Sequence, residues 1–334
     1  MSEIIEKQQK LASIEKILET QPIAGADFIV QATVLGFSCV VKKDEFKPGD
    51  FTIFHAPDTI ADSENPQYEF LRKNNWRIKQ CKFKNVRSQG LCLPLSTFDI
   101  KLEEAYEGRD VTDLVKIKKY EKEHSFLVFE AKGSFPAFLR KTDEENILKW
   151  KNVLNELAGL EFYLSVKNDG SSFTTYLNNG EFGVCSRRLD LKPSQENVFW
   201  AAAYKYNVEQ KMREIGGNFA IQAELCGPKL NGNKLKLSTN TLYLFDVFDI
   251  DKQDYVGFDR MIEIAERLGL ETVMILETGL FDYTLSQLQD EADKLEYKPG
   301  VKAEGMVLRP KIPIYSETMK QRLSVKVLNN NYKD

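Results

Sequence analysis

Lys167-Asn168-Asp169-Gly170 lies between two runs that favour β-structure, Phe162-Tyr163-Leu164-Ser165-Val166 and Phe173-Thr174-Thr175-Tyr176. Lys-x-Asp-Gly at a strand end is the pattern that a lysine nucleophile needs. It places the amine at the mouth of a pocket, and the glycine permits a tight turn beside it. The adjacent carboxylate could serve a phosphate-bound metal. A turn of these residue types is common on protein surfaces, so its meaning depends on the rest of the chain.

The bulk composition indicates a folded protein of more than one domain. The chain has 334 residues, of which 42% are hydrophobic, enough for a buried core and for two domains rather than one. Its formal net charge of -4 argues against a wholly basic nucleic-acid binder. A local basic face remains compatible with that charge, because binding responds to the patch and not to the sum.

Cysteine and histidine usage disfavours several kinds of site. The five cysteines are scattered without a C-x-x-C pair, so neither a disulfide framework nor a structural zinc site is expected. The two histidines, His55 and His124, are too few to suggest histidine-based acid–base chemistry. The charged N-terminus has no apolar signal region, and no run approaches membrane-spanning length. We therefore expect a soluble protein of the cytoplasm or another reducing compartment, neither secreted nor in a membrane.

Residues 1–115 are predicted to form a domain of short strands punctuated by glycine and proline. The β-rich runs include residues 28–34, 37–41 and 51–54, with Pro48-Gly49-Asp50 as a turn before the last. Many short strands in so short a segment suit a small barrel such as an OB-fold. Residues 116–130 are charged and weakly patterned, which suits a linker, and residues 131–334 form the second domain.

A basic run, residues 72–95, contains neither Asp nor Glu. Its residues include the cations Arg77, Lys79, Lys82 and Lys84 and the aromatic side chains Trp76 and Phe83. On a barrel face such cations could follow a phosphate backbone while the rings stack on bases. An edge strand protected by charge would look the same, and the run by itself favours neither interpretation.

The second domain is predicted to be α+β with a large antiparallel component. Thr142-Asp143-Glu144-Glu145 fits a capping box that opens a helix, with Ile147, Trp150, Val153, Leu154 and Leu157 on one face. Ser194 is expected to cap a second helix that runs to about Ile215. Beyond it we expect strands at 220–226, 241–250, 306–308 and 323–327 and helices at 260–268 and 286–295.

Five polar segments occur in order from Lys167 onward, each at a predicted strand end or just inside a strand. They are Lys167-Asn168-Asp169-Gly170, Ser186-Arg187-Arg188, Gln222-Ala223-Glu224-Leu225-Cys226-Gly227-Pro228, Ala303-Glu304-Gly305-Met306-Val307 and Ser324-Val325-Lys326. A sixth, Leu244-Phe245-Asp246, is mainly apolar, and an aromatic strand residue is most often simply core. Each segment could be structural on its own, but all six in this order are hard to obtain by chance.

With these segments the sequence resembles the covalent nucleotidyltransferases, and most closely the ATP-dependent RNA ligases. It is similar to the branch with an N-terminal OB domain before a ligase-2-like nucleotidyltransferase domain. The resemblance covers nearly the whole chain and also rests on residues 9–14, 22–27, 40–50, 88–95, 135–136 and 141–144. It implies an OB-type β-barrel followed by an α+β, ATP-grasp-like ligase domain built on antiparallel sheets.

The resemblance implies an enzyme that joins RNA 3′-OH and 5′-phosphate ends with ATP. Lys167 would attack the α-phosphate to form lysyl-AMP, and the AMP would then pass to the RNA end. The nucleotide would be contacted by Val166, Lys167, Arg187, Arg188, Glu224, Phe245, Val307 and Lys326, with Phe245 stacked on adenine. The catalytic set would be Lys167, Asp169, Glu224, Glu304 and Lys326. RNA would be contacted by Arg77, Lys79, Lys82, Lys84, Arg187 and Arg188.

Elementary chemistry agrees with these roles. An amine attacks only when neutral, whereas a free lysine is protonated at neutral pH. A divalent metal on the α-phosphate puts a positive charge beside the amine and lowers its pKa. The carboxylates of Asp169, Glu224 and Glu304 suit Mg²⁺ or Mn²⁺ held through water. Lys326 and the arginines would neutralise charge on the phosphate oxygens.

The chain also departs from its resemblance at one position. Relatives often carry a second lysine two positions after the one that matches Lys326, and this chain has Leu328 there. One phosphate contact is therefore missing or supplied from elsewhere.

The partners that the resemblance implies are the ends of nicked or broken RNA, with or without a bridging strand, and the chain is expected to be a monomer.

Two other interpretations remain open. One is a nucleic-acid-binding protein with a degenerate ligase domain, and the intact Lys167, Glu224, Glu304 and Lys326 argue against it. The other is an RNA-capping-type nucleotidyltransferase that uses GTP. Pocket aromatics do not distinguish adenine from guanine reliably, so the family resemblance alone disfavours this second alternative.

Overall fold

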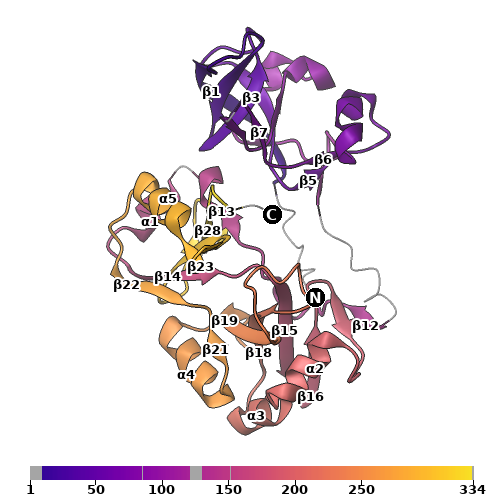
Figure 1. Ribbon diagram of the computed structural model, residues 1–334, viewed down its shortest axis with the longest axis vertical. Coiled ribbons are helices and arrows are strands. Elements are labelled where there is room, and N and C mark those ends of the chain that lie inside the picture. Colours follow the sequence, from indigo (N-terminus) through magenta and orange to yellow (C-terminus); the bar gives the residue numbers. More distant parts are fainter. Residues whose placement is uncertain (1–9, 85, 121–129, 151, 333–334) are drawn as a thin grey trace. The chain divides into compact units, whose positions relative to one another are not determined.

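The structure is a computed structural model that describes residues 10–84, 86–120, 130–150 and 152–332. The chain divides into two compact units, Met1–Glu123 and His124–Asp334 (Figure 1). The division falls within the segment expected as a linker. Part of that segment, Lys118–Lys119 (β11), pairs with Thr59–Ile60 (β5) of the N-terminal unit. Residues 121–129 of the expected linker lie outside the described residues.

The N-terminal unit is built on an antiparallel sheet in the order β3-β2-β1-β4-β9, with β10 paired to β1. Its strands are β1 Ala12–Pro22, β2 Ile29–Val34, β3 Phe37–Lys42, β4 Phe51–His55, β9 Leu91–Leu93 and β10 Arg109–Asp110. The long strand β1 pairs with β4 along its first half and with β2 along its second, and its register shifts between Ile17 and Glu19. Such a bulge bends a strand, which allows one strand to serve two parts of a barrel.

Hydrogen bonds join β3, at one end of this sheet, to residues 87–89, which lead into β9 at the other end. The Gln89 N–H donates to the Ser38 carbonyl on β3 (2.7 Å), and the Ser38 hydroxyl donates to the Arg87 carbonyl (2.9 Å). Closure removes free strand edges. The interior is filled by a core that includes Ile14, Ile53 and Tyr68. The short strands expected from the sequence thus form the OB-type barrel.

Smaller elements complete the N-terminal unit. Strand β6, Arg77–Ile78, extends the β5–β11 sheet, and β7, Cys81–Phe83, forms a hairpin with β8, Val86–Ser88. The 3-10 helices span Pro66–Asn74, Leu95–Phe98 and Leu102–Glu104. The basic run therefore begins in the last turn of the first of these helices and continues through β6, the β7–β8 hairpin and β9.

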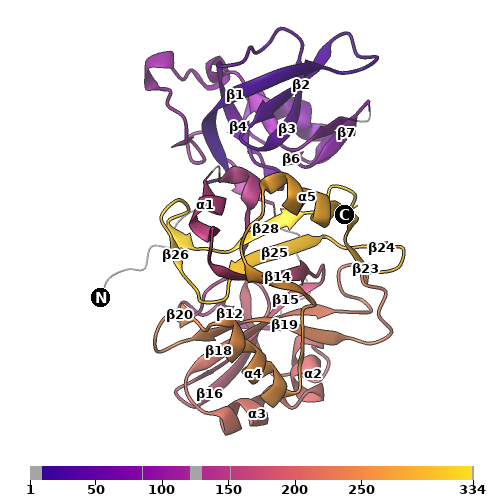
Figure 2. The same cartoon turned by 90° about the vertical axis from the view of Figure 1, so that its left-hand side faces the viewer.

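The second unit contains two mostly antiparallel sheets, seen together in Figure 2. The larger has the order β12-β17-β16-β15-β18-β19-β20, with β21 beside β19. Its strands are β12 Ala131–Ser134, β15 Ser171–Asn178, β16 Glu181–Cys185, β17 Leu189–Leu191, β18 Phe219–Cys226, β19 Thr241–Asp249, β20 Asp254–Tyr255 and β21 Glu271–Thr272.

The smaller sheet has the order β13-β28-β25-β14-β22. Its strands are β13 Glu145–Asn146, β14 Glu161–Lys167, β22 Ile275–Leu280, β25 Gly305–Pro310 and β28 Val325–Leu328. Two short hairpins lie outside both sheets, β23 Glu296–Lys298 with β24 Val301–Lys302, and β26 Tyr315–Ser316 with β27 Gln321–Arg322.

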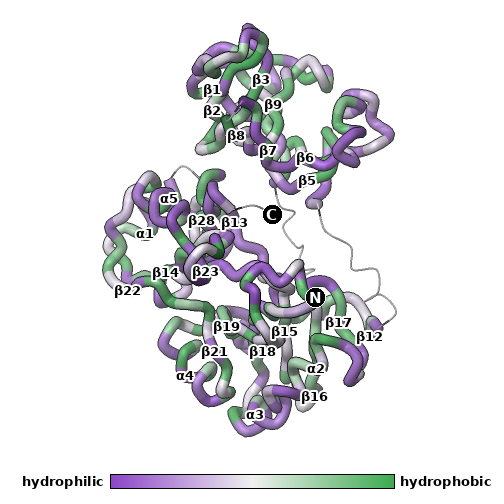
Figure 3. The backbone as a smooth tube through the Cα atoms, in the orientation of Figure 1, coloured by the Kyte–Doolittle hydropathy of each residue, from purple (hydrophilic) through white to green (hydrophobic). Residues whose placement is uncertain are grey.

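Strand β14 passes from the smaller sheet into β15 of the larger sheet through Lys167-Asn168-Asp169-Gly170. Each sheet has its own hydrophobic core, and hydrophobic stretches mark both sheets in Figure 3. The larger sheet packs against α2 Val198–Lys205, α3 Val208–Ile215 and α4 Phe258–Leu268, and the smaller against α1 Val153–Leu157 and α5 Leu285–Lys294. The turn is therefore anchored at one end in each core.

The prediction of a helix that starts at the capping box is wrong over the first half of that helix. Residues Glu145–Asn146 are strand β13, residues Ile147–Lys149 form a 3-10 helix, and α1 begins at Val153. The hydroxyl of Thr142, the expected cap, is hydrogen-bonded to Ser172 of β15 (3.1 Å), and Glu145, the expected partner in the box, lies in β13 opposite Val325 of β28. Tertiary contacts thus override the local capping signal.

The helix expected from Ser194 to about Ile215 is two helices, α2 and α3. Asn197 rather than Ser194 caps α2, and it accepts hydrogen bonds from the N–H groups of Phe199 (2.9 Å) and Trp200 (3.2 Å). Asn207, with a φ of 52°, separates the two helices. The later helices agree with expectation, since α4 ends before Gly269 and α5 begins at Leu285. Within the described ranges, no helix is both long and apolar enough to cross a bilayer.

Gly305 generates a prediction about stability. Its φ is +154°, and a Cβ at this position would lie 2.2 Å from the Val327 carbonyl oxygen on β28. We predict that Gly305→Ala lowers the free energy of unfolding by about 2 kcal/mol or more, because contact with backbone cannot be relieved by a rotamer change. Urea unfolding measures the loss, with Gly133→Ala as the control because nothing lies within 4 Å of its Cβ position. Equal stability of the two variants would contradict the close approach of β25 and β28.

Candidate active site

Strands β14, β25 and β28 lie side by side and bring together residues from three of the sequence segments. Lys167 at the end of β14 is paired with Gly305, which follows Glu304. Val307 on β25 is paired with Lys326 on β28. Because antiparallel register is fixed by the ladder, residues far apart in sequence meet at one end of this sheet.

The Lys167 amine is ion-paired with Glu304. Nζ lies 2.7 Å from Glu304 Oε2, and both side chains are about three-quarters buried, with 25% and 22% exposed. Burial alone would lower the pKa of Lys167, but the carboxylates of Glu304, Glu224 and Asp169 outweigh it and hold that pKa above its ordinary value. The nucleotide-free chain therefore keeps this amine protonated, and a nucleophilic role requires a second cation to draw the carboxylates away.

Glu224 faces the same turn from β18. Its Oε1 accepts the Gly170 N–H at 3.0 Å, and it is paired across the strands with Ser172. The pKa of Glu224 is raised to about 7, mainly by burial, with Glu304 and Asp169 adding to the rise and Lys167 and the Gly170 N–H opposing it. Gly170 permits this approach, because a Cβ there would lie 2.5 Å from the Leu225 carbonyl oxygen.

The Asp169 side chain is held from two directions. Asn231 donates to Oδ1 from the loop after β18, and the Tyr332 hydroxyl donates to Oδ2 from the C-terminal segment. The sequence placed Asp169 in the site but gave no indication of these two partners. Both are polar side chains on irregular segments, whose positions depend on the completed fold.

A pocket opens beside Lys167, with about 440 Å³ of space that includes its open mouth. Its lining residues are Thr142, Glu144, Ser165, Val166, Lys167, Asn168, Glu224, Phe245, Val273, Val307 and Arg309. Val166, Phe245, Val273 and Val307 provide apolar surface, while the remaining lining residues are polar, with Lys167, Glu224, Glu144 and Arg309 charged. A pocket that sets apolar walls beside convergent polar groups is typical of a site that binds and orients a small ligand.

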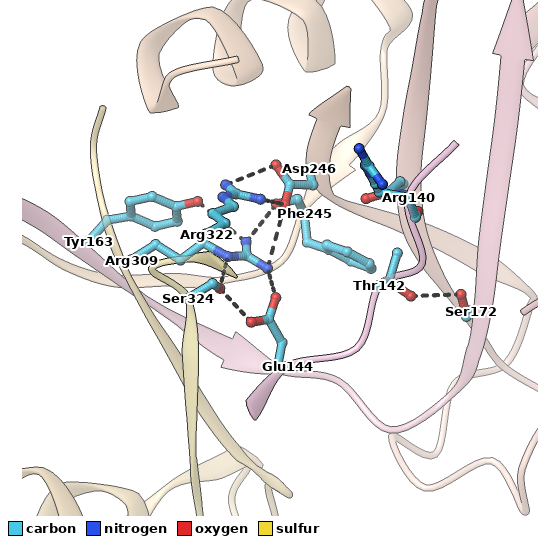
Figure 4. A network of polar contacts seen from close by, with 11 residues as sticks. Arg140, Thr142, Glu144, Tyr163, Ser172, Phe245, Asp246, Arg309, Arg322 and Ser324 are labelled. Carbon is cyan, nitrogen blue, oxygen red and sulfur yellow. Dashed lines mark hydrogen bonds and ion pairs between the residues drawn. The ribbon is translucent and has the colours of Figure 1, made fainter. Parts of the chain in front are cut away.

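A buried ionic network supports the Phe245 segment (Figure 4). Arg309, with its side chain 2% exposed, donates to Glu144 Oε1 (2.5 Å) and to the Phe245 carbonyl (2.9 Å). The neighbouring Asp246 pairs with Arg322 at 2.5 Å. Burial would raise the pKa of Glu144, but Arg309 and Ser324 outweigh it and lower that pKa. The network satisfies its own charges and fixes the backbone that carries Phe245.

Sequence reasoning missed Glu144 and Arg309 as pocket residues. Arg309 could have been flagged, because an arginine inside the apolar run 306–310 requires a partner if that run is buried. Glu144 could not, because its local pattern predicts a helix cap and its true partners come from distant strands.

The two arginines of Ser186-Arg187-Arg188 lie on an exposed turn between β16 and β17. Arg187 pairs with Asp143 at 2.5 Å, and the Arg188 carbonyl accepts the Phe135 N–H at 2.6 Å. Neither arginine is among the described residues that line the pocket, and neither is Lys326. Contacts from these residues to a nucleotide stay predictions.

The basic run separates into packed and exposed residues. Arg77 pairs with Asp58 (3.0 Å), and its guanidinium lies 3.9 Å from the ring centroid of Tyr120. Trp76 packs against the barrel core. The exposed cations of the run are Arg72 and Lys73, at the end of the first 3-10 helix, and Lys79, Lys82 and Lys84, and Phe83 is exposed as well. Lys84 Nζ donates to the Gly25 carbonyl (2.7 Å). Of the four cations in this run that are predicted to contact RNA, the three lysines are therefore the exposed ones.

The acidic residues around Lys167 match a divalent cation in chemistry but do not form a ready-made cage. Among the described residues, no group of three or more His, Cys, Asp or Glu side chains is placed to hold a metal ion directly. Asp169, Glu224 and Glu304 nevertheless all raise the pKa of Lys167, so negative charge accumulates at one point. This donor set fits a hard cation that retains several waters, as Mg²⁺ does.

Comparisons with known proteins agree with this geometry. Residues 160–328 match the RNA ligase family model, and residues 11–95 match an OB-fold domain. A solved structure of Naegleria gruberi RNA ligase with PPi has a TM-score of 0.85 and 32% sequence identity, covering 97% of this chain and 98% of that chain. The chain belongs to the RNA ligase family.

Two further structures of the N. gruberi RNA ligase are similar to this RNA ligase. They are a glutamate-to-alanine variant with AMP and Mn and a lysine-to-alanine variant with ATP and Mn. Each has a TM-score of 0.86 and 32% identity, covering 97% of this chain and 98% of that chain. No curated protein matches the sequence. The expected fold, an OB-type barrel followed by an α+β ligase unit, is confirmed.

The raised pKa of Glu224 predicts how the stability of this RNA ligase depends on pH. The folded chain binds a proton at Glu224 up to about pH 7, whereas an unfolded glutamate releases it near its lower ordinary pKa. Stability should therefore fall as pH rises. Without nucleotide or metal, the wild type should lose roughly 1–3 kcal/mol relative to Glu224→Gln between about pH 5 and about pH 8.

Urea unfolding in EDTA at several pH values measures this difference. Glu161→Gln, at the exposed start of β14, shows the effect of removing a carboxylate outside the site. Parallel stability curves for the wild type and Glu224→Gln would contradict the raised pKa.

Proposed function

We propose that Lys167 is the residue through which this RNA ligase passes AMP from ATP to an RNA end. The observation that carries the proposal is the position of the amine, 2.7 Å from Glu304 and at a pocket that Phe245 and Val307 also line. An amine paired with a carboxylate that a metal could draw away has the parts needed to attack a phosphate.

The enzyme is an ATP-dependent RNA ligase, and its overall reaction joins a 3′-OH to a 5′-phosphate. In the proposed first step the Lys167 amine, having lost a proton, attacks the α-phosphorus of ATP. An N–P bond forms, and the bond to pyrophosphate breaks. The AMP then moves to the RNA 5′-phosphate, which frees the lysine. Attack by the RNA 3′-OH on that phosphate forms the phosphodiester and releases AMP.

The contents of the N. gruberi RNA ligase structures support this substrate and this metal class. Those structures hold PPi, AMP with Mn, and ATP with Mn. ATP is accordingly the nucleotide of this ligase, and Mg²⁺ or Mn²⁺ its metal. The metal would supply positive charge beside the α-phosphate and favour the neutral amine. Asp169, Glu224 and Glu304 would hold it through water.

The pocket suggests how the nucleotide is bound. We assign Phe245 to stacking on adenine, with Val307 and Val166 as the other apolar surfaces. Glu224 would contact the ribose or the waters of the metal. Lys326 would contact the α-phosphate, and Arg187 and Arg188 would serve the nucleotide and the RNA end. The hydrogen bond from Arg309 to the Phe245 carbonyl keeps the stacking residue in place.

RNA ends are the partners of the enzyme. We propose that these are nicked or broken ends, with or without a bridging strand, and that the ligase acts as a monomer. All five cysteines are free, which favours the cytoplasm or another reducing compartment. The alternative of a GTP-using capping-type enzyme is distinguished by the mass of the adduct formed with each nucleotide.

Replacement of Lys167 tests the nucleophile. We predict that Lys167→Ala and Lys167→Arg form no covalent adduct with ATP and Mg²⁺, whereas the wild type gains the mass of AMP. Lys167→Arg keeps a positive charge opposite Glu304 but offers no neutral amine. Intact-protein mass spectrometry after denaturation measures the adduct, with GTP as a parallel sample. AMP bound covalently to either variant would show that another residue is the nucleophile.

The exposed lysines of the basic run are predicted to bind RNA. Replacing Lys79, Lys82 and Lys84 by Ala should weaken RNA binding, and the log–log salt dependence should flatten by roughly 0.7–0.9 for each RNA phosphate that the variant no longer binds. Arg77 is kept, because its contacts with Asp58 and Tyr120 are structural. Fluorescence anisotropy with labelled RNA at several salt concentrations measures both quantities.

The matched control changes three other exposed lysines of the same unit, Lys42, Lys43 and Lys47, to Ala. Wild-type affinity and salt slope in the Lys79, Lys82 and Lys84 variant would mean that the run is a protected strand edge. RNA contact would then be assigned to Arg187 and Arg188.

A further inference from the structure

The Tyr297 hydroxyl lies at the point where the chain around Lys167 and the chain around Glu304 stop pairing with each other. Tyr297 is on β23 and half-buried. Its hydroxyl donates to the Lys167 carbonyl (2.9 Å). The same oxygen accepts the N–H of Asp169 (3.0 Å) and the N–H of Glu304 (3.2 Å). One phenol thus bonds to the backbone of three residues proposed for catalysis.

The position of these bonds explains their importance. The β14–β25 ladder ends with the pair Lys167 and Gly305. Past this pair the two chains diverge, since Asp169 leads into β15 of the larger sheet and Glu304 comes from the β23–β24 hairpin. Backbone groups beyond a ladder need other partners. Here the Tyr297 hydroxyl supplies them, so it continues the link between the strands past the last ladder pair.

The Glu304 segment is also held from its other side. The Asn329 N–H donates to the Glu304 carbonyl (2.8 Å), and Asn329 Nδ2 donates to the Ala303 carbonyl (3.0 Å). These bonds fix Glu304 relative to β28. The bonds of Tyr297 fix Glu304 relative to Lys167, which is the separation that matters for the 2.7 Å ion pair.

We propose that Tyr297 is a positioning residue for lysine adenylylation. Its hydroxyl holds the backbone that carries the nucleophile at a fixed distance from the backbone that carries Glu304. This inference rests on the proposed role of Lys167. Tyr297 is not among the described residues that line the pocket, so its hydroxyl acts on the alignment of Lys167 and Glu304 rather than on the affinity for the nucleotide.

The expected effect of Tyr297→Phe follows from this separation of roles. The variant keeps the ring and loses the hydroxyl. We expect the rate of lysyl-AMP formation at saturating ATP to fall about tenfold or more, because small misplacements of reacting groups are costly. The KM for ATP should change less than about threefold, because the pocket walls are untouched. The Mg²⁺ concentration for half-maximal rate should rise, since Glu304 and Asp169 lose a common anchor.

Thermal unfolding first checks that each full-length protein is folded. Single-turnover adenylylation then compares the wild type with Tyr297→Phe, Tyr283→Phe and Lys167→Ala. Tyr283→Phe is the matched control, because its hydroxyl donates to the exposed Glu277 (2.6 Å), outside the site. A wild type without adduct would refute the proposed function itself. A wild type that reacts, with Tyr297→Phe within twofold of its rate, would refute the positioning role alone. A rate loss equal to that of Tyr283→Phe would do the same.

Hydrogen exchange in the wild type and in Tyr297→Phe gives a second readout that does not depend on catalysis. The amides of Asp169 and Glu304 should be protected in the nucleotide-free enzyme, because the Tyr297 oxygen accepts from both. Free exchange at both amides would overturn the proposal, and protection that disappears in Tyr297→Phe would support it.

Discussion

The pairing of β14 with β25 is the constraint on which the rest of the catalytic unit depends. It sets Lys167 against Gly305 and therefore beside Glu304. It also places Val166 and Val307 on adjoining strands, where both line the pocket. Strand β14 leads directly into β15 of the larger sheet, so the turn that carries Lys167, the proposed nucleophile, is anchored in two hydrophobic cores at once. A lysine on a free loop would not be held in a fixed position. Phosphoryl-type transfer depends mainly on the alignment of the reacting groups, so a fixed position matters.

The unit contains two buried ionic clusters with different charge balance. In the cluster of Glu144, Asp246, Arg309 and Arg322, acids and bases pair directly, and Arg309 completes its bonds with backbone and hydroxyl groups. Around Lys167 the carboxylates accumulate instead, and burial, with a contribution from Glu304 and Asp169, raises the pKa of Glu224 to about 7. Buried charge without a partner is unfavourable. The first cluster is therefore balanced within the protein, whereas the second has an excess of negative charge that suits the cation proposed for it.

The sequence predicted the features that depend on local pattern. Alternating and apolar runs located β14, β18, β19 and β25, and the glycine after Asp169 marked the turn. The features that failed depend on tertiary contacts. Thr142-Asp143-Glu144-Glu145 carries a helix-capping pattern, yet the Thr142 hydroxyl bonds to Ser172 and Glu145 lies in strand β13. Tyr297 and Asn329 bind backbone groups of distant residues, and a tyrosine or asparagine in a hairpin or strand end has no sequence pattern that names such a partner.

Leu328 bears on how the phosphate is neutralised. Residues two apart on a strand face the same side, so Leu328 shares a face of β28 with Lys326. Leu328 is paired with Gly305, and its carbonyl accepts a hydrogen bond from Gln289 of α5 (2.9 Å). The backbone at this position is thus occupied in holding β28 to β25 and α5, and its side chain carries no charge. Positive charge on this face of β28 comes from Lys326. In the proposed transfer of AMP, neutralisation of the phosphate charge therefore depends on Lys326, the arginines and the metal, without a second lysine at position 328.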